Sequence, residues 1–454
     1  MAELTPMMQK YMETKEQYKD CILFYRLGDF YEMFFDDALV ASKELEITLT
    51  GKSCGLEERA PMCGIPYHAV EGYLSKLVSR GYKVAICEQV EDPKLAKGLV
   101  KREVIRVVTP GTNLNVQSLE AGKNNYLLSI AYTPDGIGIS AADVTTGDYY
   151  VTEVEDLKKL NDELMKYEPS EIICNEAFLV SGFDVNDLKS RLHISVNALE
   201  SHMFDDDGCR RILMKHFKVN TLIGLGVEEF PTGLLAAGAL LQYLYDTQKT
   251  DLEHFTHIYP YLTSKYMLLD SSTRRNLELT ETLREKQKRG SLLWVLDKTK
   301  TAMGARLLRN YIEQPLIEKD EMEKRLDAIQ ELNQDSISRD EIREYLNPIY
   351  DLERLLSKVT YKTANPRDLI AFRNSLQMLP PIKTVLSAFE KEELTEIREQ
   401  IDGLEDIYQL IDEAIIEEPP ISIREGGMIK DGFDETIDRL RSAKHDGKQW
   451  LAQL

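Results

Sequence analysis

The sequence predicts a multidomain protein in which two α/β domains are followed by a region built only of helices. Short β-rich runs alternate with helical patterns in the first half of the chain, and strand signals nearly vanish from about Pro231 onward. The length of 454 residues, with 43% hydrophobic and 29% charged residues, is typical of a soluble globular protein. Such a length predicts roughly two to four domains, each large enough for its own core.

The first α/β domain is expected over residues 1–114. Runs rich in aromatic and β-branched residues predict strands at residues 22–27 and 83–87. Apolar residues at helical spacing predict a helix at residues 69–80, which Gly81 then ends.

The second α/β domain is expected over residues 124–250, after a linker at residues 115–123. The Pro110-Gly111 pair marks the loss of periodicity that precedes this linker. Turn residues punctuate a run of predicted elements, which are strands at 125–132, 138–144 and 149–154, a helix at 157–166 and a strand at 171–174. Several strands followed by a helix and a strand predict a mixed sheet with helices on its faces.

Residues 251–421 are expected to form an all-α domain. Helical spacing with few breakers is found at residues 269–310, 319–346, 352–359, 366–378 and 394–416. Residues 422–454 begin with a glycine-rich turn and continue as a polar helix without a stop signal near the last residue. We therefore expect the chain to be cut off within an element.

Composition favours a cytoplasmic protein without a metal site. The longest apolar run, residues 234–245, is shorter than the roughly 20 residues that span a bilayer, and the first residues show no signal or lipidation pattern. The six cysteines form no C-x-x-C pair, which indicates reduced and mostly structural thiols. His254 and His257 have no acidic or cysteine partner in the sequence that would complete a metal set.

The net charge of -21 argues against a protein coated with nucleic-acid-binding surface, because binding phosphates requires local positive charge. Two segments are nevertheless basic. Residues 94–106 carry one acid and five basic residues, which are Lys94, Lys97, Lys101, Arg102 and Arg106, and residues 274–309 are also rich in Lys and Arg. Taken alone, such a run is more often a solvated face than a binding patch.

The stretch LGDFYEMFFDD at residues 27–37 places four aromatic and four acidic side chains together. Its local pattern predicts a helix that Asp29 caps, with Glu32 completing a capping box. Met33 and Phe34 would then be core residues. Phe30 would occupy the first helical position beside an exposed cap, which is a poor place to bury a large ring.

Several long motifs resemble the MutS family of bacterial DNA mismatch repair proteins. They occur in the order of the family and span nearly the whole chain. The motifs are LGDFYEMFFDDA at 27–38, residues 60–93, RVVTPGT at 106–112, LDSSTRRNLEL at 269–279, residues 290–316 and GGMIKDGFDETIDRLR at 426–441.

This resemblance implies that the first domain recognises mismatches in DNA. Phe30 would enter the minor groove and stack on a mispaired base, and Glu32 would form a hydrogen bond with that base. Lys101, Arg102 and Arg106 would be backbone contacts that carry no sequence information.

The resemblance also implies roles for the rest of the chain. The second domain would be a connector with a ribonuclease-H-like fold, the helices would form the core and lever, and residues 422–454 would begin a DNA clamp. The implied partners are double-stranded DNA with mismatches or small loops, a MutL-type repair protein and a second copy of the chain.

The chain departs from the family in one large respect. Family members end in an ATPase domain with the motif G-x-x-x-x-G-K-S/T, whereas the Gly51-Lys52-Ser53 found here has Glu46 at the first glycine position. No cofactor is therefore expected in this chain, which we predict to be inactive as an ATPase, and ATP with Mg²⁺ is implied for the missing domain.

Two other functions are compatible with the sequence. The second domain could be a metal-dependent nuclease, but the strand that begins it carries no acid, which favours a turn or surface role for Asp143 and Asp148. The chain could alternatively be a module that only binds partner repair proteins.

Overall fold

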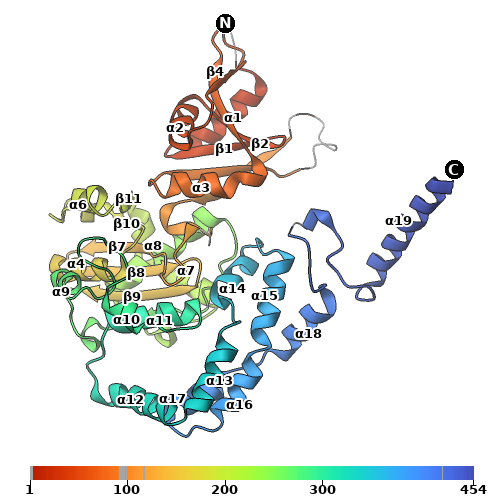
Figure 1. The fold of residues 1–454 in the computed structure, drawn as a ribbon. Helices are drawn as coiled ribbons and strands as arrows, with labels where there is room; N and C mark the ends of the chain where they lie inside the picture. The colour runs from red at the N-terminus through yellow and green to blue at the C-terminus, as the bar shows by residue number, and fades with distance from the viewer. Residues whose placement is uncertain (1–3, 92–97, 99, 116–117, 422, 454) are drawn as a thin grey trace. The chain divides into compact units, whose positions relative to one another are not determined.

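The computed structural model describes residues 4–91, 98, 100–115, 118–421 and 423–453 (Figure 1). The chain divides into two compact units, Met1–Lys286 and Gln287–Leu454. Unit 1 contains two six-stranded sheets with their helices, and unit 2 is helical over its described residues.

The first sheet has the strand order β3-β4-β2-β1-β5-β6. Its strands are β1 (Cys21–Leu27), β2 (Phe30–Phe34), β3 (Thr50–Lys52), β4 (Ala60–Pro66), β5 (Lys83–Gln89) and β6 (Arg102–Val108). β1 runs parallel to β5, and the other neighbours are antiparallel. The predicted strands at 22–27 and 83–87 are confirmed.

Helices cover both faces of this sheet. On one face, α1 (Pro6–Gln17) buries Met8 and Tyr11 among side chains of β1, β4, β5 and β6. On the other face, α2 (Phe35–Leu45) and α3 (Val70–Val78) pack over apolar residues of β1, β2, β4 and β5. The predicted helix at 69–80 is confirmed, and Gly81 follows it with a φ of +86°.

The predicted helix beginning at Asp29 is wrong. Residues Phe30–Phe34 form strand β2, which pairs with β1 on one side and β4 on the other. Glu32 is therefore not part of a capping box, and the helix α2 begins only at Phe35. Met33 and Phe34 are buried as predicted, but they point to opposite faces of the sheet.

The second sheet has the order β11-β10-β7-β8-β9-β12 and mixes parallel with antiparallel pairs, as expected. Its strands are β7 (Leu127–Thr133), β8 (Gly136–Asp143), β9 (Asp148–Val154), β10 (Glu171–Asn175), β11 (Ser195–Leu199) and β12 (Tyr259–Pro260). The helices of this part of unit 1 are α4 (Leu157–Tyr167), α5 (Glu176–Leu179), α6 (Val185–Ser190), α7 (Asp206–Phe217), α8 (Pro231–Gln248) and α9 (Ser271–Asn276). The apolar run at 234–245 lies inside the buried helix α8.

The long helical stretches predicted for unit 2 are divided into shorter helices, whereas the predicted helix at 352–359 is confirmed. They are α10 (Leu292–Leu296), α11 (Ala302–Glu313), α12 (Lys319–Gln334), α13 (Ser336–Leu346), α14 (Leu352–Thr360), α15 (Pro366–Leu376), α16 (Leu379–Leu386), α17 (Glu392–Gln400), α18 (Glu405–Ala414) and α19 (Glu435–Gln453). The predicted stretch 269–310 is interrupted between its short helices, and Asp335 starts α13 by accepting a hydrogen bond from the Ser338 amide. A core around Ile382, Leu386 and Phe389 joins four of these helices.

All six cysteines are buried and free. Burial raises the pKa of the Cys63 and Cys87 thiols to about 12, so these two groups stay protonated near neutral pH. Within the residues that the structure describes, every helix is too short or too polar to cross a lipid bilayer.

Candidate nucleic-acid interface

Phe30 lies at the tip of the hairpin formed by β1 and β2. Gly28 makes the turn with a φ of +58°, a backbone conformation that is unfavourable for residues with a side chain. Phe30 remains 47% exposed, although its neighbours in β2 are buried or half-buried. The doubt raised by the sequence about burying this ring is confirmed.

Strand geometry places Glu32 on the same face as Phe30. Successive side chains of a strand alternate between the two faces of its sheet, so residues two apart lie side by side. Tyr31, between them, points the other way into the core shared with α2 and α3. Burial and a hydrogen bond from its hydroxyl to Glu88 raise the pKa of Tyr31.

Gly64 of β4 lies beside Phe30 and Glu32 on this face. In the β2–β4 pairing, Gly64 stands opposite Glu32 and Pro66 stands opposite Phe30. A Cβ atom at position 64 would lie 3.6 Å from Glu32 Cγ and 3.9 Å from Phe30 Cδ1. The glycine therefore leaves room next to both side chains on this face.

Farther along the same face, the sheet is covered. Phe34, two residues beyond Glu32, packs against Tyr11 of α1 with ring centroids 4.9 Å apart. Both rings belong to one buried cluster. The face therefore passes from a closed core at Phe34 to an exposed ring at Phe30.

Glu32 forms an ion pair with Lys52 of strand β3. The Lys52 Nζ lies 2.5 Å from Glu32 Oε2 and 5.6 Å from the centroid of the Phe34 ring. The side chains of Glu32 and Lys52 are 16% and 33% exposed. The sequence offered Lys52 only as part of a failed phosphate-binding motif, because β4 has to be placed between β2 and β3 before the pairing is visible.

The three predicted backbone contacts differ in exposure. Lys101 has a side chain that is 66% exposed and pairs with Glu103 at 2.6 Å. Arg102 is half-buried and donates from Nε to the Arg26 carbonyl at 2.7 Å. Arg106 is half-buried in β6, opposite Ile86.

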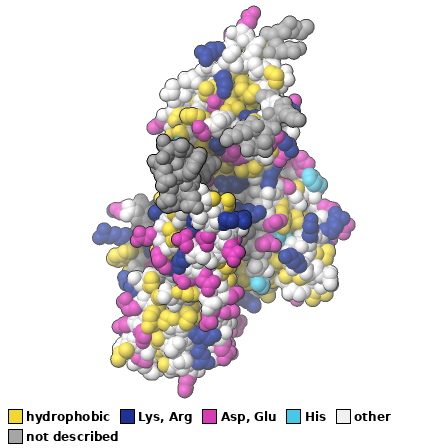
Figure 2. Space-filling view, turned by 90° about the vertical axis from the view of Figure 1, so that its right-hand side faces the viewer, with side chains coloured by type: hydrophobic (Ala, Val, Ile, Leu, Met, Phe, Trp, Pro, Cys, Tyr) yellow, Lys and Arg dark blue, Asp and Glu magenta, His cyan; other side chains and the backbone are white. Residues whose placement is uncertain are grey.

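The other two lysines of the basic run, Lys94 and Lys97, lie outside the described residues. On the face drawn in Figure 2, Lys and Arg side chains are interspersed with acidic and hydrophobic ones. The described atoms there form no continuous basic surface.

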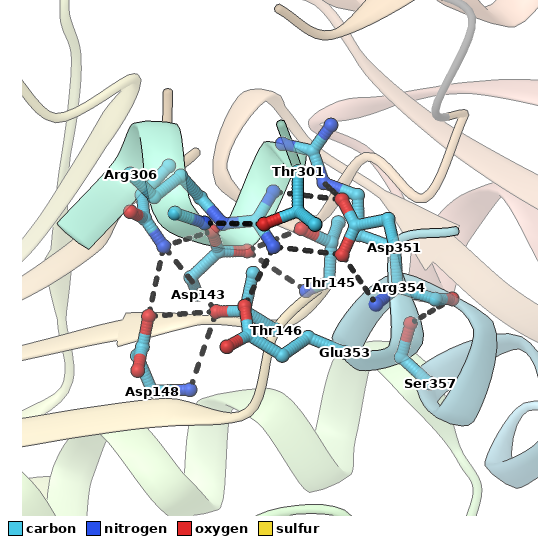
Figure 3. A network of polar contacts seen from close by, with 12 residues as sticks. Asp143, Thr145, Thr146, Asp148, Thr301, Arg306, Asp351, Glu353, Arg354 and Ser357 are labelled. Atoms are coloured by element: carbon cyan, nitrogen blue, oxygen red, sulfur yellow. Dashed lines mark hydrogen bonds and ion pairs between the residues drawn. The ribbon is translucent and has the colours of Figure 1, made fainter. Parts of the chain in front are cut away.

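Basic side chains between residues 274 and 309 also have structural roles. In unit 2, Arg306 is buried and binds Asp351 with two hydrogen bonds of 2.7 Å and Glu353 with one of 2.6 Å (Figure 3). Arg309 pairs with Glu313 on the next turn of α11. These two arginines stabilise the helical unit rather than forming a free basic face.

Asp143 and Asp148, the acids considered for a nuclease, hold the turn between β8 and β9 (Figure 3). Asp143 is fully buried, so the predicted turn role is confirmed for it and the surface role is wrong. Its carboxylate accepts hydrogen bonds from the Asn125 amide at 3.0 Å and from the Thr145 amide and hydroxyl at 2.8 and 2.7 Å. The Asn124 side chain donates to both carboxylates, at 2.9 and 2.8 Å.

These donors occupy the lone pairs that a nuclease would use to bind metal ions. Over the described residues, no group of three or more His, Cys, Asp or Glu side chains is placed to hold a metal ion. The nuclease alternative is not favoured.

Comparison with known families assigns the chain in three consecutive parts. Residues 5–117 match the family described as MutS domain I, residues 125–256 match MutS domain II, and residues 272–452 match MutS domain III. Phe30, Glu32 and Lys52 lie within the first match.

Curated relatives are similar over the whole chain, and each is named DNA mismatch repair protein MutS. The protein of Lachnoclostridium phytofermentans is 67% identical over 100% of this chain and 49% of its own length. Those of Ruminiclostridium cellulolyticum and Acetivibrio thermocellus are 52% and 51% identical, over 100% of this chain and 52% of their lengths. The chain spans about half the length of these relatives. It belongs to the MutS family of DNA mismatch repair proteins.

Proposed function

We propose that unit 1 recognises mispaired or looped duplex DNA by inserting Phe30 into the minor groove, with Glu32 contacting the displaced base. One observation carries this proposal. An exposed aromatic ring and a carboxylate lie side by side on one sheet face, at the tip of a hairpin and next to a glycine.

An apolar wedge favours mismatches because its insertion costs less free energy there than at a paired site. Separating two stacked base steps costs a few kcal/mol and kinks the duplex. A mismatch has already lost part of this stacking and pairing energy, so the wedge costs less there than at a paired site. The hairpin supports this role, because both of its strands are hydrogen-bonded within a six-stranded sheet and hold the ring on a rigid base.

Glu32 makes this discrimination sharper. A carboxylate near DNA phosphates weakens binding to every duplex, whereas a hydrogen bond to a displaced base recovers energy only at a mismatch. The two effects together raise the ratio of mismatch affinity to paired affinity.

Backbone contacts supply affinity that does not depend on sequence. Lys101 is the best placed of the three proposed contacts, because its side chain is 66% exposed. Arg102 and Arg106 remain proposed contacts, and DNA binding at either one requires rearrangement of a half-buried side chain.

The remaining proposals concern the rest of the chain and its partners. We propose that the second sheet is a ribonuclease-H-like connector, that the helices of unit 2 are core and lever, and that α19 begins a DNA clamp. The proposed partners are a MutL-type repair protein and a second copy of the protein, in the cytoplasm. ATP and Mg²⁺ are proposed to act outside the residues of this chain.

The proposal is tested with Phe30→Ala in the protein at its full natural length, with affinities for a G·T mismatch and a paired duplex measured at one salt concentration. We expect most of the mismatch preference to be lost, because alanine cannot stack on a base. Leu39→Ala is the matched control, since Leu39 lies on α2 and is also 47% exposed. A folded Phe30→Ala protein that keeps its preference would show the wedge assignment to be wrong.

For Glu32→Ala we expect tighter binding to paired DNA, and therefore a smaller mismatch preference. Removing a carboxylate removes its repulsion of phosphates together with its hydrogen bond to the base. Unchanged affinity for paired DNA would leave Glu32 as a structural partner of Lys52.

A further inference from the structure

Lys52 of β3 contacts Glu32 of β2, although β3 and β2 are not neighbours in the sheet. β3 pairs with β4 and β4 pairs with β2, so the Lys52 side chain crosses β4 to reach Glu32. Cross-strand partners lie on one face of a sheet. The register pairs Lys52 with Ala60 and Glu32 with Gly64, and Met62 lies between these two positions on the same face of β4.

The geometry defines what Lys52 does to the carboxylate. In the described part of the chain, the Glu32 carboxylate has Lys52 as its partner, through Oε2 at 2.5 Å. A lysine bound to one carboxylate oxygen leaves the other with lone pairs that can accept a hydrogen bond. Its charge also offsets that of the carboxylate at short range.

We propose that Lys52 is a specificity-determining residue that positions Glu32 for the mispaired base. Lys52 binds one carboxylate oxygen of Glu32 and so fixes the side-chain conformation. The other oxygen then lies beside Phe30, where it can accept a hydrogen bond from the base. This inference rests on the proposed function, because it assigns Lys52 a role through Glu32 and not through DNA.

The alternative role for Lys52 is a direct contact with a DNA phosphate. A phosphate contact strengthens binding to mismatched and paired duplexes alike, and it contributes about 0.9 to the slope of log affinity against log salt concentration. A positioning role changes the ratio between the two duplexes and leaves this slope unchanged. The two roles therefore differ in what they alter.

The test is a double-mutant cycle of Lys52→Met and Glu32→Ala in the protein at its full natural length, with G·T and paired duplexes at several salt concentrations. We expect Lys52→Met to lower the mismatch preference roughly five- to tenfold, the value of one well-placed hydrogen bond. In the Glu32→Ala background, Lys52→Met should leave the preference unchanged. Lys52→Arg keeps a cation at this position and should restore most of the preference.

Lys83→Met is the matched control. Lys83 belongs to the same sheet and pairs with Asp20 at 3.0 Å, but it lies opposite Cys21, at the end of β1 away from the hairpin. Its removal should leave the preference unchanged. Thermal unfolding of each variant shows whether a loss of mismatch preference reflects misfolding. If Lys52→Met is misfolded, Lys52→Arg replaces it as the test: the inference holds if Lys52→Arg keeps the mismatch preference and fails if Lys52→Arg loses it.

Two results would overturn the inference. An equal loss of affinity for both duplexes with a shallower salt slope would make Lys52 a phosphate contact. A loss of preference that persists in the Glu32→Ala background would show that Lys52 acts independently of Glu32. If Phe30→Ala and Glu32→Ala both leave the preference intact, the proposed function fails, whereas failure of the cycle alone removes only the role of Lys52.

Discussion

At the scale of single residues, the surroundings of a side chain indicate its role better than its residue type does. An exposed phenylalanine is common on protein surfaces and needs no explanation by itself. Phe30 is distinguished by Glu32 beside it, Gly64 next to both and Lys52 bound to Glu32. His254 shows the opposite case, because its residue type suggests chemistry while its surroundings indicate a structural role.

His254 is buried, and its Nε2 lies 3.1 Å from the Val144 carbonyl oxygen. Burial lowers the pKa of His254 to about 4, and the charge of His216 acts in the same direction. The folded state therefore resists protonation that the unfolded chain accepts below pH 6.5. The stability that the neutral ring provides is complete above pH 6.5 and is lost as the pH falls toward 4.

For this reason we expect His254→Gln to flatten the fall in unfolding free energy between pH 6.5 and 4, by at most about 3 kcal/mol. Glutamine keeps an amide donor and does not titrate. Denaturant unfolding at a series of pH values measures the effect. His257→Gln, at an exposed neighbour, is the control for removing a histidine from this segment. Parallel curves for the wild type and His254→Gln would contradict the assignment.

At the scale of elements, the turn in the RVVTPGT motif fastens the first sheet to the second. It contains the 3₁₀ turn Pro110–Thr112, which Thr109 caps. Buried Glu171 of β10 accepts hydrogen bonds from the Thr109 hydroxyl and, at 3.1 Å, from the Gly111 amide. Tyr243 of α8 donates to the same carboxylate at 2.8 Å. Packing of this turn against β10 thus accounts for Thr109 and Gly111 of the motif.

Gly111→Ala should destabilise unit 1 by about 1–3 kcal/mol, because the new methyl group has no room. Its Cβ would lie 2.8 Å from Leu127 Cβ and 3.1 Å from Glu171 Cβ. Gly72→Ala in α3 is the control, since nothing lies within 4 Å of that position, and alanine there should stabilise the helix by roughly 0.5–1 kcal/mol. Urea unfolding distinguishes the two. Equal stability of both variants would show that the turn does not pack as described.

At the scale of the whole molecule, each unit has buried clusters of its own among the described residues. Buried clusters around Phe24, Leu128 and Ala236 are built from residues of unit 1. Those around Phe389 and Ile411 are built from residues of unit 2. Each unit buries its own apolar surface, which is the condition for a cooperative folding unit.

Calorimetry should therefore resolve two thermal transitions in the 454-residue chain. The matched variants Phe389→Ala and Phe178→Ala assign them, because each removes one buried ring at a cost of about 3–5 kcal/mol. Phe389→Ala should lower the transition of unit 2 and Phe178→Ala that of unit 1. If either variant shifts both transitions equally, the units unfold as one.

The amino-acid sequence by itself determined the two α/β parts, the helical remainder and the family. The β-rich runs at residues 22–27 and 149–154 and the helical spacing at 69–80 agree with the structure, because residue type and apolar spacing record how a local element is buried. The local pattern also indicated that Phe30 was hard to bury, before any strand partner was known.

Only the tertiary structure decided the conformation and contacts of Phe30 and Glu32, the two residues proposed to read the mismatch. Residues 29–34 satisfy a helical capping pattern, but β1 and β4 supply hydrogen bonds on both sides and make β2 a strand. The ion pair of Glu32 with Lys52 and the burial of Asp143 likewise depend on strands that the chain brings together from distant positions. Local propensity is a weak preference, and pairing between distant segments outweighs it.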